Sequence, residues 1–432
     1  MKKILIISPY FPPVNAADMQ RVRMTLPTLV ERGWSVEVVT VDENYVDFKT
    51  DSLLALTVPE NVKIHKVKAF SKKYTMKIGL GSIALRSIWY YKNKVNDLLT
   101  KNKFDLIFFS TTQFPICVLG AYWFKKFGIP YVIDMQDPWV STYYEQKPKK
   151  ERPKKYWFSS RLNRLLEPIA FSKVGGIMSV SEVYINQLNE RYSITKKIPC
   201  ETITFGAFKE DIKIVKQHFS ELSAPVFENT KNTNLVYIGR GGFDMQQAFK
   251  VILNSFKKAL SENFDYYDDL RFYFIGTSYA PKGKETHTLL PIATEMDLER
   301  YVTEIPERIG YYESLKNLKC ANGTILLGSD DSAYTASKLY PNILVEKPLL
   351  AVLNKFSSAA KILKECNAGK LITLDQSEEE SLETFKSYVS DVKSNKIPEV
   401  NQEEFSKYTA EQLSMRQIDL FNKVISSSKD RI

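Results

Sequence analysis

The sequence predicts an α/β protein built from two doubly wound parallel sheets that follow one another along the chain. Short apolar runs that suit buried parallel strands alternate with longer segments whose apolar residues recur at helical spacing. This alternation breaks over residues 213–232, which hold Pro225 and many polar side chains, and then restarts. The length of 432 residues also exceeds one typical core, so we expect two domains of similar size.

The first domain is predicted to span residues 1–212. An apolar run at residues 3–8 is typical of a first strand, and Asp18 opens an amphipathic helix that ends at Gly33. The remaining strands are predicted at residues 35–41, 62–67, 106–110, 131–134, 176–180 and 202–206, and the remaining helices at 83–99, 115–127 and 183–191. Residues 213–232 are the predicted linker.

The second domain is predicted to span residues 233–401. Its strands are predicted at residues 235–238, 271–275, 324–327 and 349–353, with helices at 245–260 and 311–318 and from about Ser337 to Lys347-Pro348. Residues 362–371 and 382–392 supply later elements. A long final helix follows, and its apolar residues do not obviously belong to either sheet.

Composition limits the kinds of protein this chain can be. The hydrophobic share of 44% and charged share of 25% are typical of a soluble globular protein, and no apolar run reaches the length of a membrane span. Four widely spaced cysteines and three histidines form no pattern for a disulfide framework or a zinc site, so a reducing cytoplasm is expected. The net charge of +10 indicates a negatively charged partner: nucleic acid, an anionic membrane or a phosphorylated ligand.

Ligands of such sheets bind at the carboxyl ends of strands, so the residues there are candidates for a site. Gly239, Arg240 and Gly241 follow one predicted strand, where glycines let a ligand approach the backbone and an arginine can pair with phosphate oxygens. The turn matches neither a P-loop nor a dinucleotide fingerprint. The alternative for Arg240 is a surface arginine after a tight turn.

A second anion site is predicted where the helix near Ser337 begins. Unpaired N–H groups and the positive end of the helix dipole favour phosphate there, Lys338 adds a cation, and the Thr335 and Ser337 hydroxyls can donate. The alternative is an ordinary helix cap with a solvated lysine. Two cationic candidates, Arg240 and Lys338, in one half of the chain favour a diphosphate ligand.

Four groups of residues carry a resemblance to a known family. They are Ser8-Pro-Tyr-Phe-Pro-Pro13 with Arg21 and Gly33-Trp34, Asp134-Met-Gln-Asp-Pro-Trp139, Tyr237-Ile-Gly-Arg240, and Tyr334-Thr-Ala-Ser-Lys-Leu-Tyr340 through Lys347-Pro348. In this order they resemble family 4 glycosyltransferases with the GT-B fold, over nearly the whole chain. The resemblance implies two Rossmann-like domains facing a cleft, with the final helix (residues 402–428) joining the N-terminal domain.

The resemblance also implies roles for particular residues. A nucleotide sugar would bind the C-terminal half, and the residues around it would be Gly239, Arg240, Gly241, Thr335, Ser337, Lys338 and Asn342. In that set Arg240 and Lys338 would contact the diphosphate, and Asn342 could bond a ribose hydroxyl. The acceptor would lie on the N-terminal half, near Ala16, Ala17, Asp18 and Arg21.

Asp137 is the candidate catalytic residue. It follows the strand at residues 131–134, with Pro138 fixing the next turn and Trp139 able to shield the site. A carboxylate there could accept a proton from the acceptor hydroxyl, or steady positive charge at the anomeric carbon. The alternative is an aspartate that caps a turn before proline.

The sequence departs from the family pattern at two places. The family's paired glutamates, eight positions apart, would fall at Ala333 and Pro341, and Met245-Gln-Gln247 stands where a lysine usually follows the arginine. These departures leave the sugar donor and the retention of anomeric configuration open. The missing glutamates also keep a non-catalytic partner subunit as an alternative function. A sugar-nucleotide epimerase of the same fold is another alternative, with Asp137 and Asp18 as its candidate acid and base residues.

Basic residues between Lys147 and Lys155 precede Tyr156-Trp-Phe158. This pattern is typical of either a solvated loop or a surface that binds anionic lipid.

Together with the resemblance, these features predict a cytoplasmic, membrane-peripheral glycosyltransferase. It would move a sugar from a nucleoside diphosphate to a glycan or lipid-linked acceptor in surface polysaccharide synthesis. Neither a metal nor a cofactor is implied, since no suitably placed DxD is present. Nucleic-acid binding is disfavoured because no reader module is recognisable.

Overall fold

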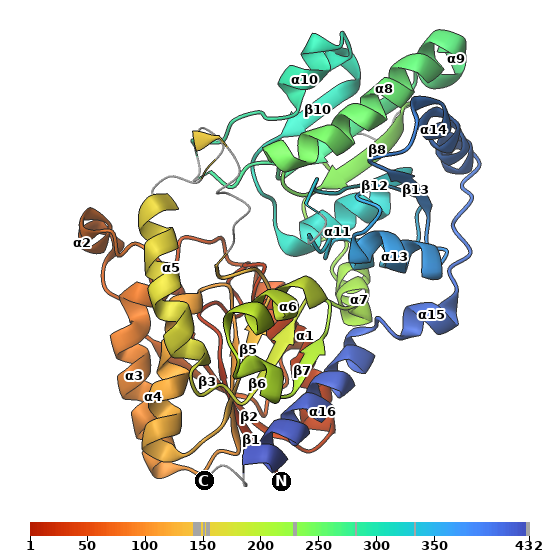
Figure 1. The fold of residues 1–432 in the computed structure, drawn as a ribbon. Helices are drawn as coiled ribbons and strands as arrows, with labels where there is room; N and C mark the ends of the chain where they lie inside the picture. The colour runs from red at the N-terminus through yellow and green to blue at the C-terminus, as the bar shows by residue number, and fades with distance from the viewer. Residues whose placement is uncertain are drawn as a thin grey trace. The chain divides into compact units, whose positions relative to one another are not determined.

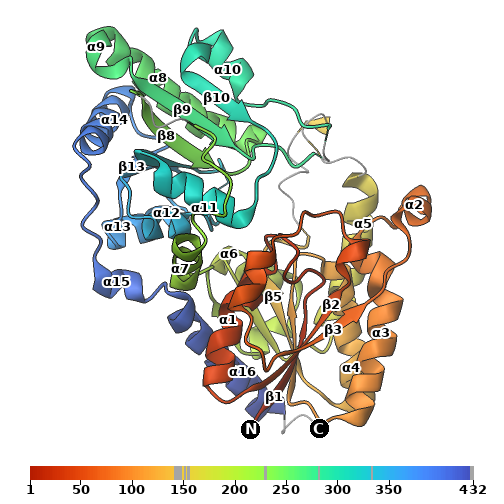
Figure 2. The ribbon, with the colours of Figure 1, turned by 180° about the vertical axis from the view of Figure 1, so that it is seen from behind.

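A computed structural model of the chain describes residues 1–140, 148–149, 152, 156–227, 231–280, 283–331 and 334–428. The chain forms two compact units, the first made of Met1–Phe205 with Ala410–Ile432 and the second of Gly206–Thr409. Each unit holds one all-parallel sheet with helices packed against both of its faces (Figures 1 and 2). The predicted fold class, α/β with two doubly wound parallel sheets, is confirmed.

The sheet of the first unit has seven strands in the order β3-β2-β1-β4-β5-β6-β7. The strands are β1 (Lys3–Ile7), β2 (Ser35–Val41), β3 (Lys63–Val67), β4 (Leu106–Ser110), β5 (Tyr131–Met135), β6 (Gly176–Ser179) and β7 (Cys200–Thr202). Alternate residues of β1 bury on opposite faces: Leu5 and Ile7 join one core cluster, and Ile4 and Ile6 join the other. This two-sided burial explains why the strands are continuous apolar runs in the sequence.

The helices of the first unit are α1 (Gln20–Glu31), α2 (Lys72–Thr75), α3 (Ile83–Lys101), α4 (Val118–Phe127), α5 (Tyr156–Phe171), α6 (Glu182–Arg191) and α16 (Ala410–Ser428). The last of these comes from the far end of the chain and covers the same face of the sheet as α1. Phe421 packs 5.0 Å from the Phe108 ring, measured between ring centroids. Val424 lies so close to Gly176 that a Cβ there would come within 2.5 Å of it, so only glycine fits.

The sheet of the second unit has six strands in the order β10-β9-β8-β11-β12-β13. The strands are β8 (Thr233–Ile238), β9 (Leu270–Ile275), β10 (Val302–Ile305), β11 (Gly323–Leu327), β12 (Leu349–Leu353) and β13 (Lys370–Thr373). The helices are α7 (Lys209–Gln217), α8 (Gln246–Glu262), α9 (Phe264–Tyr267), α10 (Leu290–Glu295), α11 (Tyr311–Cys320), α12 (Leu339–Leu344), α13 (Ser358–Glu365), α14 (Glu378–Lys393) and α15 (Gln402–Ser406). On β8, Leu235 and Tyr237 enter the larger core cluster, while Val236 and Ile238 enter the smaller one.

The structure corrects the position of the linker, which was predicted at residues 213–232. The first unit ends at Phe205, and α7 already belongs to the second unit. Asp211 of α7 accepts hydrogen bonds from the hydroxyls of Tyr311 (2.7 Å) and Tyr312 (3.0 Å) on α11. The sequence pattern failed here because α7 is short and mostly charged, so few apolar positions mark its period.

Several other elements differ from the sequence prediction. The strands β10 and β13 were not predicted, because each is four residues long and includes a charged residue. The strand expected at residues 202–206 lies instead at Cys200–Thr202. The long final helix is two helices, α15 and α16, and only α16 joins the first unit. The helix expected to begin near Ser337 begins at Leu339 and has six residues.

Candidate functional site

Each sheet has one place where its strand order reverses, and most predicted site residues follow strands at these two places. Asp137 follows β5, one strand further along the first sheet. In the first unit β1 lies between β2 and β4, and in the second unit β8 lies between β9 and β11. The loops that leave such neighbouring strands diverge to opposite faces of the sheet, and ligands bind in the crevice between them. We call these two regions the unit 1 edge and the unit 2 edge.

Arg240 at the unit 2 edge is held in place by two neighbours. Its guanidinium makes a two-pronged ion pair with Asp244, with both N–O distances at 2.6 Å. The guanidinium carbon also lies 5.1 Å from the centre of the Tyr334 ring. The arginine is therefore oriented before any ligand binds, although part of its charge is already balanced by Asp244.

The glycines on either side of Arg240 serve packing within the protein. The N–H groups of Gly239 and Gly241 donate to the carbonyl oxygens of Ile275 (3.0 Å) and Thr277 (2.9 Å). A Cβ at Gly241 would come within 2.6 Å of the Thr288 hydroxyl oxygen, so a larger residue would displace that loop. Their backbone N–H groups are thus engaged internally, and the predicted contact of Gly239 and Gly241 with a sugar donor stays a prediction.

Lys338 is the cation of the unit 2 edge whose environment most favours an anion. Its ammonium has no hydrogen bond or ion pair within the described part of the chain. Burial, and then the positive charge of Arg308, lower the pKa of Lys338 to about 8. Arg308 lies in the loop after β10, with its guanidinium carbon 5.2 Å from the centre of the Tyr279 ring. An anionic ligand beside both cations would relieve their repulsion and restore the lysine charge.

Asn342, on α12, holds the backbone at Lys338 in place. Its side-chain N–H donates to the carbonyl oxygen of Lys338 (2.8 Å), while its own buried oxygen has no partner among the described residues. Ser337 donates its N–H to the Thr335 carbonyl (2.9 Å), which forms a tight turn, and both side chains are half-buried. Because α12 is so short, charged side chains rather than the helix dipole dominate the field at this edge.

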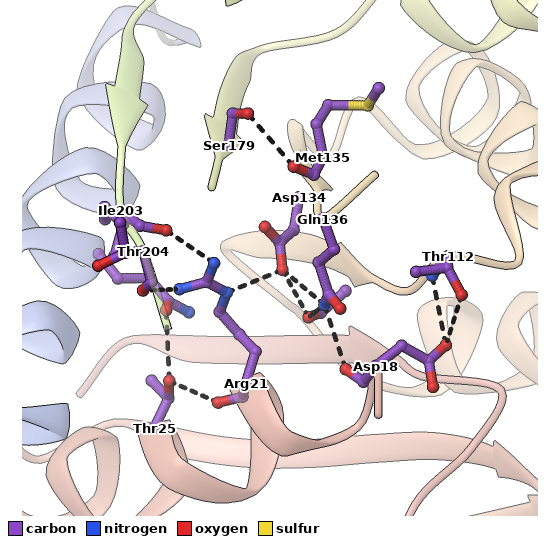
Figure 3. Close-up of polar contacts among 12 residues, drawn as sticks. Asp18, Arg21, Thr25, Thr112, Asp134, Met135, Gln136, Ser179, Ile203 and Thr204 are labelled. Carbon is purple, nitrogen blue, oxygen red and sulfur yellow. Dashed lines mark hydrogen bonds and ion pairs between the residues drawn. The ribbon is translucent and has the colours of Figure 1, made fainter. Parts of the chain in front are cut away.

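Asp18 at the unit 1 edge does not cap α1, as the sequence suggested. Its carboxylate instead accepts hydrogen bonds from the Thr111 hydroxyl (3.0 Å) and the Thr112 N–H (3.2 Å), in the loop after β4. Burial raises the pKa of Asp18 to about 6, against the lowering effect of these hydrogen bonds. Figure 3 shows the carboxylate turned towards Thr112. Ala16 beside it is buried and Ala17 is exposed.

Arg21 lies in the core of the same unit, with all its functional nitrogens engaged. Its Nε donates to Asp134 (3.0 Å), and its two terminal nitrogens donate to the carbonyl oxygens of Thr204 (2.8 Å) and Ile203 (2.7 Å) (Figure 3). The guanidinium carbon is 4.9 Å from the centre of the Phe205 ring. Arg21 therefore ties α1 to β5 and to the segment after β7, and a direct contact with an acceptor stays a prediction.

The residues after β5 divide into buried and exposed positions. Gln136 is buried and its side-chain N–H donates to the Asp18 carbonyl (3.1 Å), the Ser110 hydroxyl (3.0 Å) and Asp134 (2.8 Å) (Figure 3). Asp137 is exposed, so a ligand can reach its carboxylate. Trp139, predicted to shield the site, is instead buried in the core, stacked on Phe114 at 5.3 Å between ring centroids.

The comparisons with known proteins identify the fold. No protein-family model matches the chain, and no curated protein matches it in sequence. Among solved structures, a sucrose-phosphate synthase from Thermosynechococcus elongatus matches with a TM-score of 0.65 and 12% identity, covering 99% of this chain and 100% of that one. The catalytic domain of Arabidopsis thaliana starch synthase IV, bound to ADP and acarbose, has a TM-score of 0.57 and 12% identity, with 98% and 99% covered.

A third structure, Anabaena HepE in complex with UDP, has a TM-score of 0.53 and 12% identity, with 100% of this chain and 98% of that chain covered. The chain has the GT-B fold. This confirms the fold that the sequence motifs implied, over the full length of the chain. In GT-B terms the two edges described above belong to the N-terminal and the C-terminal Rossmann-like domain.

Sequence reasoning missed three residues at the edges of this GT-B protein. Thr111 and Thr112 directly follow a predicted strand, so the rule that located Asp137 would also have found them. Arg308 was missed because the strand before it, β10, was not predicted. Ala333 and most of the basic stretch 147–155 lie outside the described residues.

Neither a metal cluster nor a membrane span is found in the part of the chain that the structure describes. No three His, Cys, Asp or Glu side chains come together there in a way that could hold a metal ion. No helix there has both the length and the apolar character needed to cross a bilayer. The four cysteines are free thiols.

Proposed function

We propose that this protein is a glycosyltransferase. It would move a sugar from a nucleoside diphosphate to a hydroxyl of a glycan or lipid-linked acceptor, in the synthesis of a surface polysaccharide. The observation that carries the proposal is Lys338, a cation with a lowered pKa beside Arg308 at the carboxyl edge of the unit 2 sheet. Two solved structures with this fold hold UDP or ADP, which fits a diphosphate at that edge.

The unit 2 edge would supply the electrostatics of transfer. As the bond between the sugar and the diphosphate breaks, negative charge grows on the leaving phosphate. Lys338, Arg308 and Arg240 would stabilise that charge, and cations held in place in advance do this at little cost in reorganisation. Metal-independent transfer is therefore part of the proposal. Asn342, with its unpaired buried oxygen, is proposed to accept a hydrogen bond from the ribose of the sugar donor.

The unit 1 edge would supply the acceptor side. Asp137 is proposed as the carboxylate nearest the reacting centre, where it accepts the proton of the acceptor hydroxyl or orients the sugar. Ala16, Ala17 and Asp18 are proposed to line the acceptor site. Asp18, with a pKa near 6, is ionised at neutral pH and would accept hydrogen bonds from sugar hydroxyls. Arg21 would act through Asp134 and the β5 loop, by holding these groups in place.

A second function, that of a non-catalytic partner subunit, is favoured by one observation. Pro341 of α12 stands where the resemblance places the second glutamate of the family's pair, the one that binds the ribose of the sugar donor. A protein that had lost this contact would keep the fold and the cations without turning over.

A nucleotide panel separates the two functions. We expect UDP, GDP or ADP to raise the melting temperature, because a ligand that binds only the folded state stabilises it. The matching nucleotide sugar should also be hydrolysed slowly. Stabilisation by a nucleotide without hydrolysis of any sugar donor would support the partner subunit. If no diphosphate nucleotide stabilises the protein, the glycosyltransferase proposal is wrong.

Asp137→Asn tests the proposed catalytic residue. We expect nucleotide binding to be kept and turnover to fall about a hundredfold, the low end of the contribution of a general base. Asp419→Asn, an exposed aspartate on α16 of the same unit, is the matched control and should leave turnover unchanged. Turnover of Asp137→Asn within a factor of two of the control, on the order of experimental error, would assign Asp137 a structural role.

A further inference from the structure

Outside both edges, the first unit carries a surface of exposed apolar and basic side chains, which we call the basic-aromatic surface. Its apolar members are Phe70, Tyr74, Met76, Trp89, Trp157 and Leu165, whose exposure runs from 47% at Phe70 to 68% at Tyr74. Large apolar side chains that gather on one surface mark a contact with a partner or a membrane.

Two distant segments form this surface. Phe70 packs against Trp89 and Tyr90, with ring centroids 6.4 and 5.1 Å away. The Phe158 ring, at the start of α5, lies against Gly79, where a Cβ would be 3.4 Å from it. The segment that holds α2 is thereby joined to α5, and both views of the fold show α2 beside α5 (Figures 1 and 2).

The helix α5 has an outward stripe that an ordinary surface helix lacks. Trp157, Arg161, Leu165 and Ile169 follow one another at a spacing of four residues, and all four are exposed. The Arg161 guanidinium carbon lies 5.6 Å from the centre of the Trp157 ring. Residues spaced in this way lie along one side of a helix, so α5 presents an apolar stripe with a cation to its surroundings.

The charge of the basic-aromatic surface indicates a negatively charged partner. Residues 68–94 contain seven Lys and Arg residues and no Asp or Glu. Lys72 is paired with Asp47, but Lys73 and Lys77 have no ion pair in the described part of the chain. Aromatic side chains among lysines and arginines match the chemistry of an anionic lipid surface, where rings enter the headgroup layer and cations bind phosphate.

We propose that the basic-aromatic surface docks this protein on an anionic lipid bilayer. Tyr74, Met76, Trp157 and Leu165 enter the headgroup layer, and Lys73, Lys77 and Arg161 bind lipid phosphates. Docking does not depend on the proposed glycosyl transfer.

The position of this surface bears on the acceptor, and this step rests on the proposed function. The chain reaches α2 and α5 from the carboxyl ends of β3 and β5. Asp18 follows the carboxyl end of β1, and the carboxyl ends of β1, β3 and β5 lie at one end of the sheet because all seven strands are parallel. A bilayer bound there favours an acceptor that stays anchored in the lipid over a free oligosaccharide.

Flotation with vesicles tests the docking. We expect the protein to float with vesicles of equimolar phosphatidylcholine and phosphatidylglycerol and to remain in the bottom fraction with vesicles of phosphatidylcholine alone. Added salt should release it from the anionic vesicles. The pair Lys73→Gln and Lys77→Gln should weaken binding roughly 25-fold, since each basic residue near the surface contributes about a factor of five. The pair Trp157→Ser and Leu165→Ser should weaken it roughly tenfold or more.

Matched controls come from the second unit. The pair Lys361→Gln and Lys364→Gln removes exposed lysines from α13, and Phe356→Ser removes an exposed ring. All controls should float as the wild type does. Equal flotation on neutral and anionic vesicles, or unchanged binding of both test pairs, would overturn the proposal. A dimer seen by light scattering that dissociates when Trp157 and Leu165 are changed would also overturn it, because the partner would then be a second copy of the chain.

The same variants separate docking from catalysis. Each should keep the nucleotide-induced rise in melting temperature, which also shows that it is folded. If docking is confirmed while no sugar is transferred, only the step that concerns the acceptor fails. If vesicles speed transfer to a lipid-linked acceptor in the wild type and not in the test pairs, that step is supported too.

Discussion

The two edges of this protein share a topology and differ in how their charges are balanced. Both lie beside the first strand of a parallel sheet, where the strand order reverses. At the unit 1 edge, one oxygen of Asp134 accepts hydrogen bonds from Arg21, Ser110 and Gln136. At the unit 2 edge, Lys338 has no such partner in the described part of the chain. Topology therefore locates a site, while unbalanced charge indicates which ligand it takes.

The pKa shifts at the two edges have one cause and opposite signs. Burial raises the pKa of Asp18 to about 6 and is the largest factor in lowering that of Lys338 to about 8. The pKa of each group therefore lies closer to neutral pH than its usual value does, so a small change in its surroundings changes its charge. Groups shifted in this way concentrate at functional sites, and the changes below test each side of the comparison.

The largest expected effect is the loss of Arg21. Arg21→Ala would leave Asp134 as a buried charge without its cation, and breaking such a pair costs about 3–5 kcal/mol in the free energy of unfolding. Urea unfolding measures this, with a change of the exposed arginine at the C-cap of the same helix, Arg32→Ala, as a control. A loss below about 1 kcal/mol, as for a surface ion pair, would show that Arg21 is not the support inferred here.

Asp18→Asn should change how stability depends on pH. The pKa of Asp18 is raised in the folded state, so its contribution to stability is complete below its unfolded value near 4 and is lost as pH rises through about 6. The variant should lack this decline, on the order of 2–3 kcal/mol. Denaturant unfolding at several pH values shows it. The same pH dependence in both proteins would contradict a raised pKa at Asp18.

Alanine at Arg240 or Lys338 should weaken nucleotide binding. A charged hydrogen bond contributes about 1.5–3 kcal/mol. Each change is therefore expected to lower the affinity for a nucleoside diphosphate roughly tenfold or more. Calorimetric titration measures it, with Lys361→Ala on α13 as the control. Since Asp244 already balances part of the arginine charge, the loss at Lys338 should be the greater. Unchanged affinity in both variants would remove the diphosphate site from this edge.

The smallest effect is a pH dependence of that affinity. The ligand binds the protonated lysine, so affinity should be level below pH 8 and fall as pH rises above it, by up to about tenfold per pH unit. Lys338→Arg keeps its charge throughout and should give a flat profile. A wild-type profile as flat as that of the variant would show that Lys338 is not the titrating group.

The sequence was sufficient for the fold because most strands of both sheets are buried on both faces. Residues 106–109 and Leu349–Leu353 are apolar throughout and stand out in any pattern. The edge strand β10 contains Thr303 and Glu304, so it was missed, and Arg308 after it was missed as well. For the site, the positions of Arg240, Lys338 and Asp18 were predictable from strand ends. Thr111 and Arg308, which affect Asp18 and Lys338, lie on other segments, and only the folded chain brings them near. Asp244 is four residues from Arg240, but the ion pair between them is seen only in the folded chain.

The helix α16 has a consequence for how this protein is made. A ribosome completes the sheet of the first unit early, yet the helix that covers Phe108 and Gly176 emerges only after the whole second unit has been synthesised. Until then the nascent chain exposes an apolar face, a state that chaperones bind and proteases remove. A chain whose synthesis stops within the second unit lacks α16, so the apolar face of its first sheet stays exposed. We therefore expect such truncated chains to be degraded.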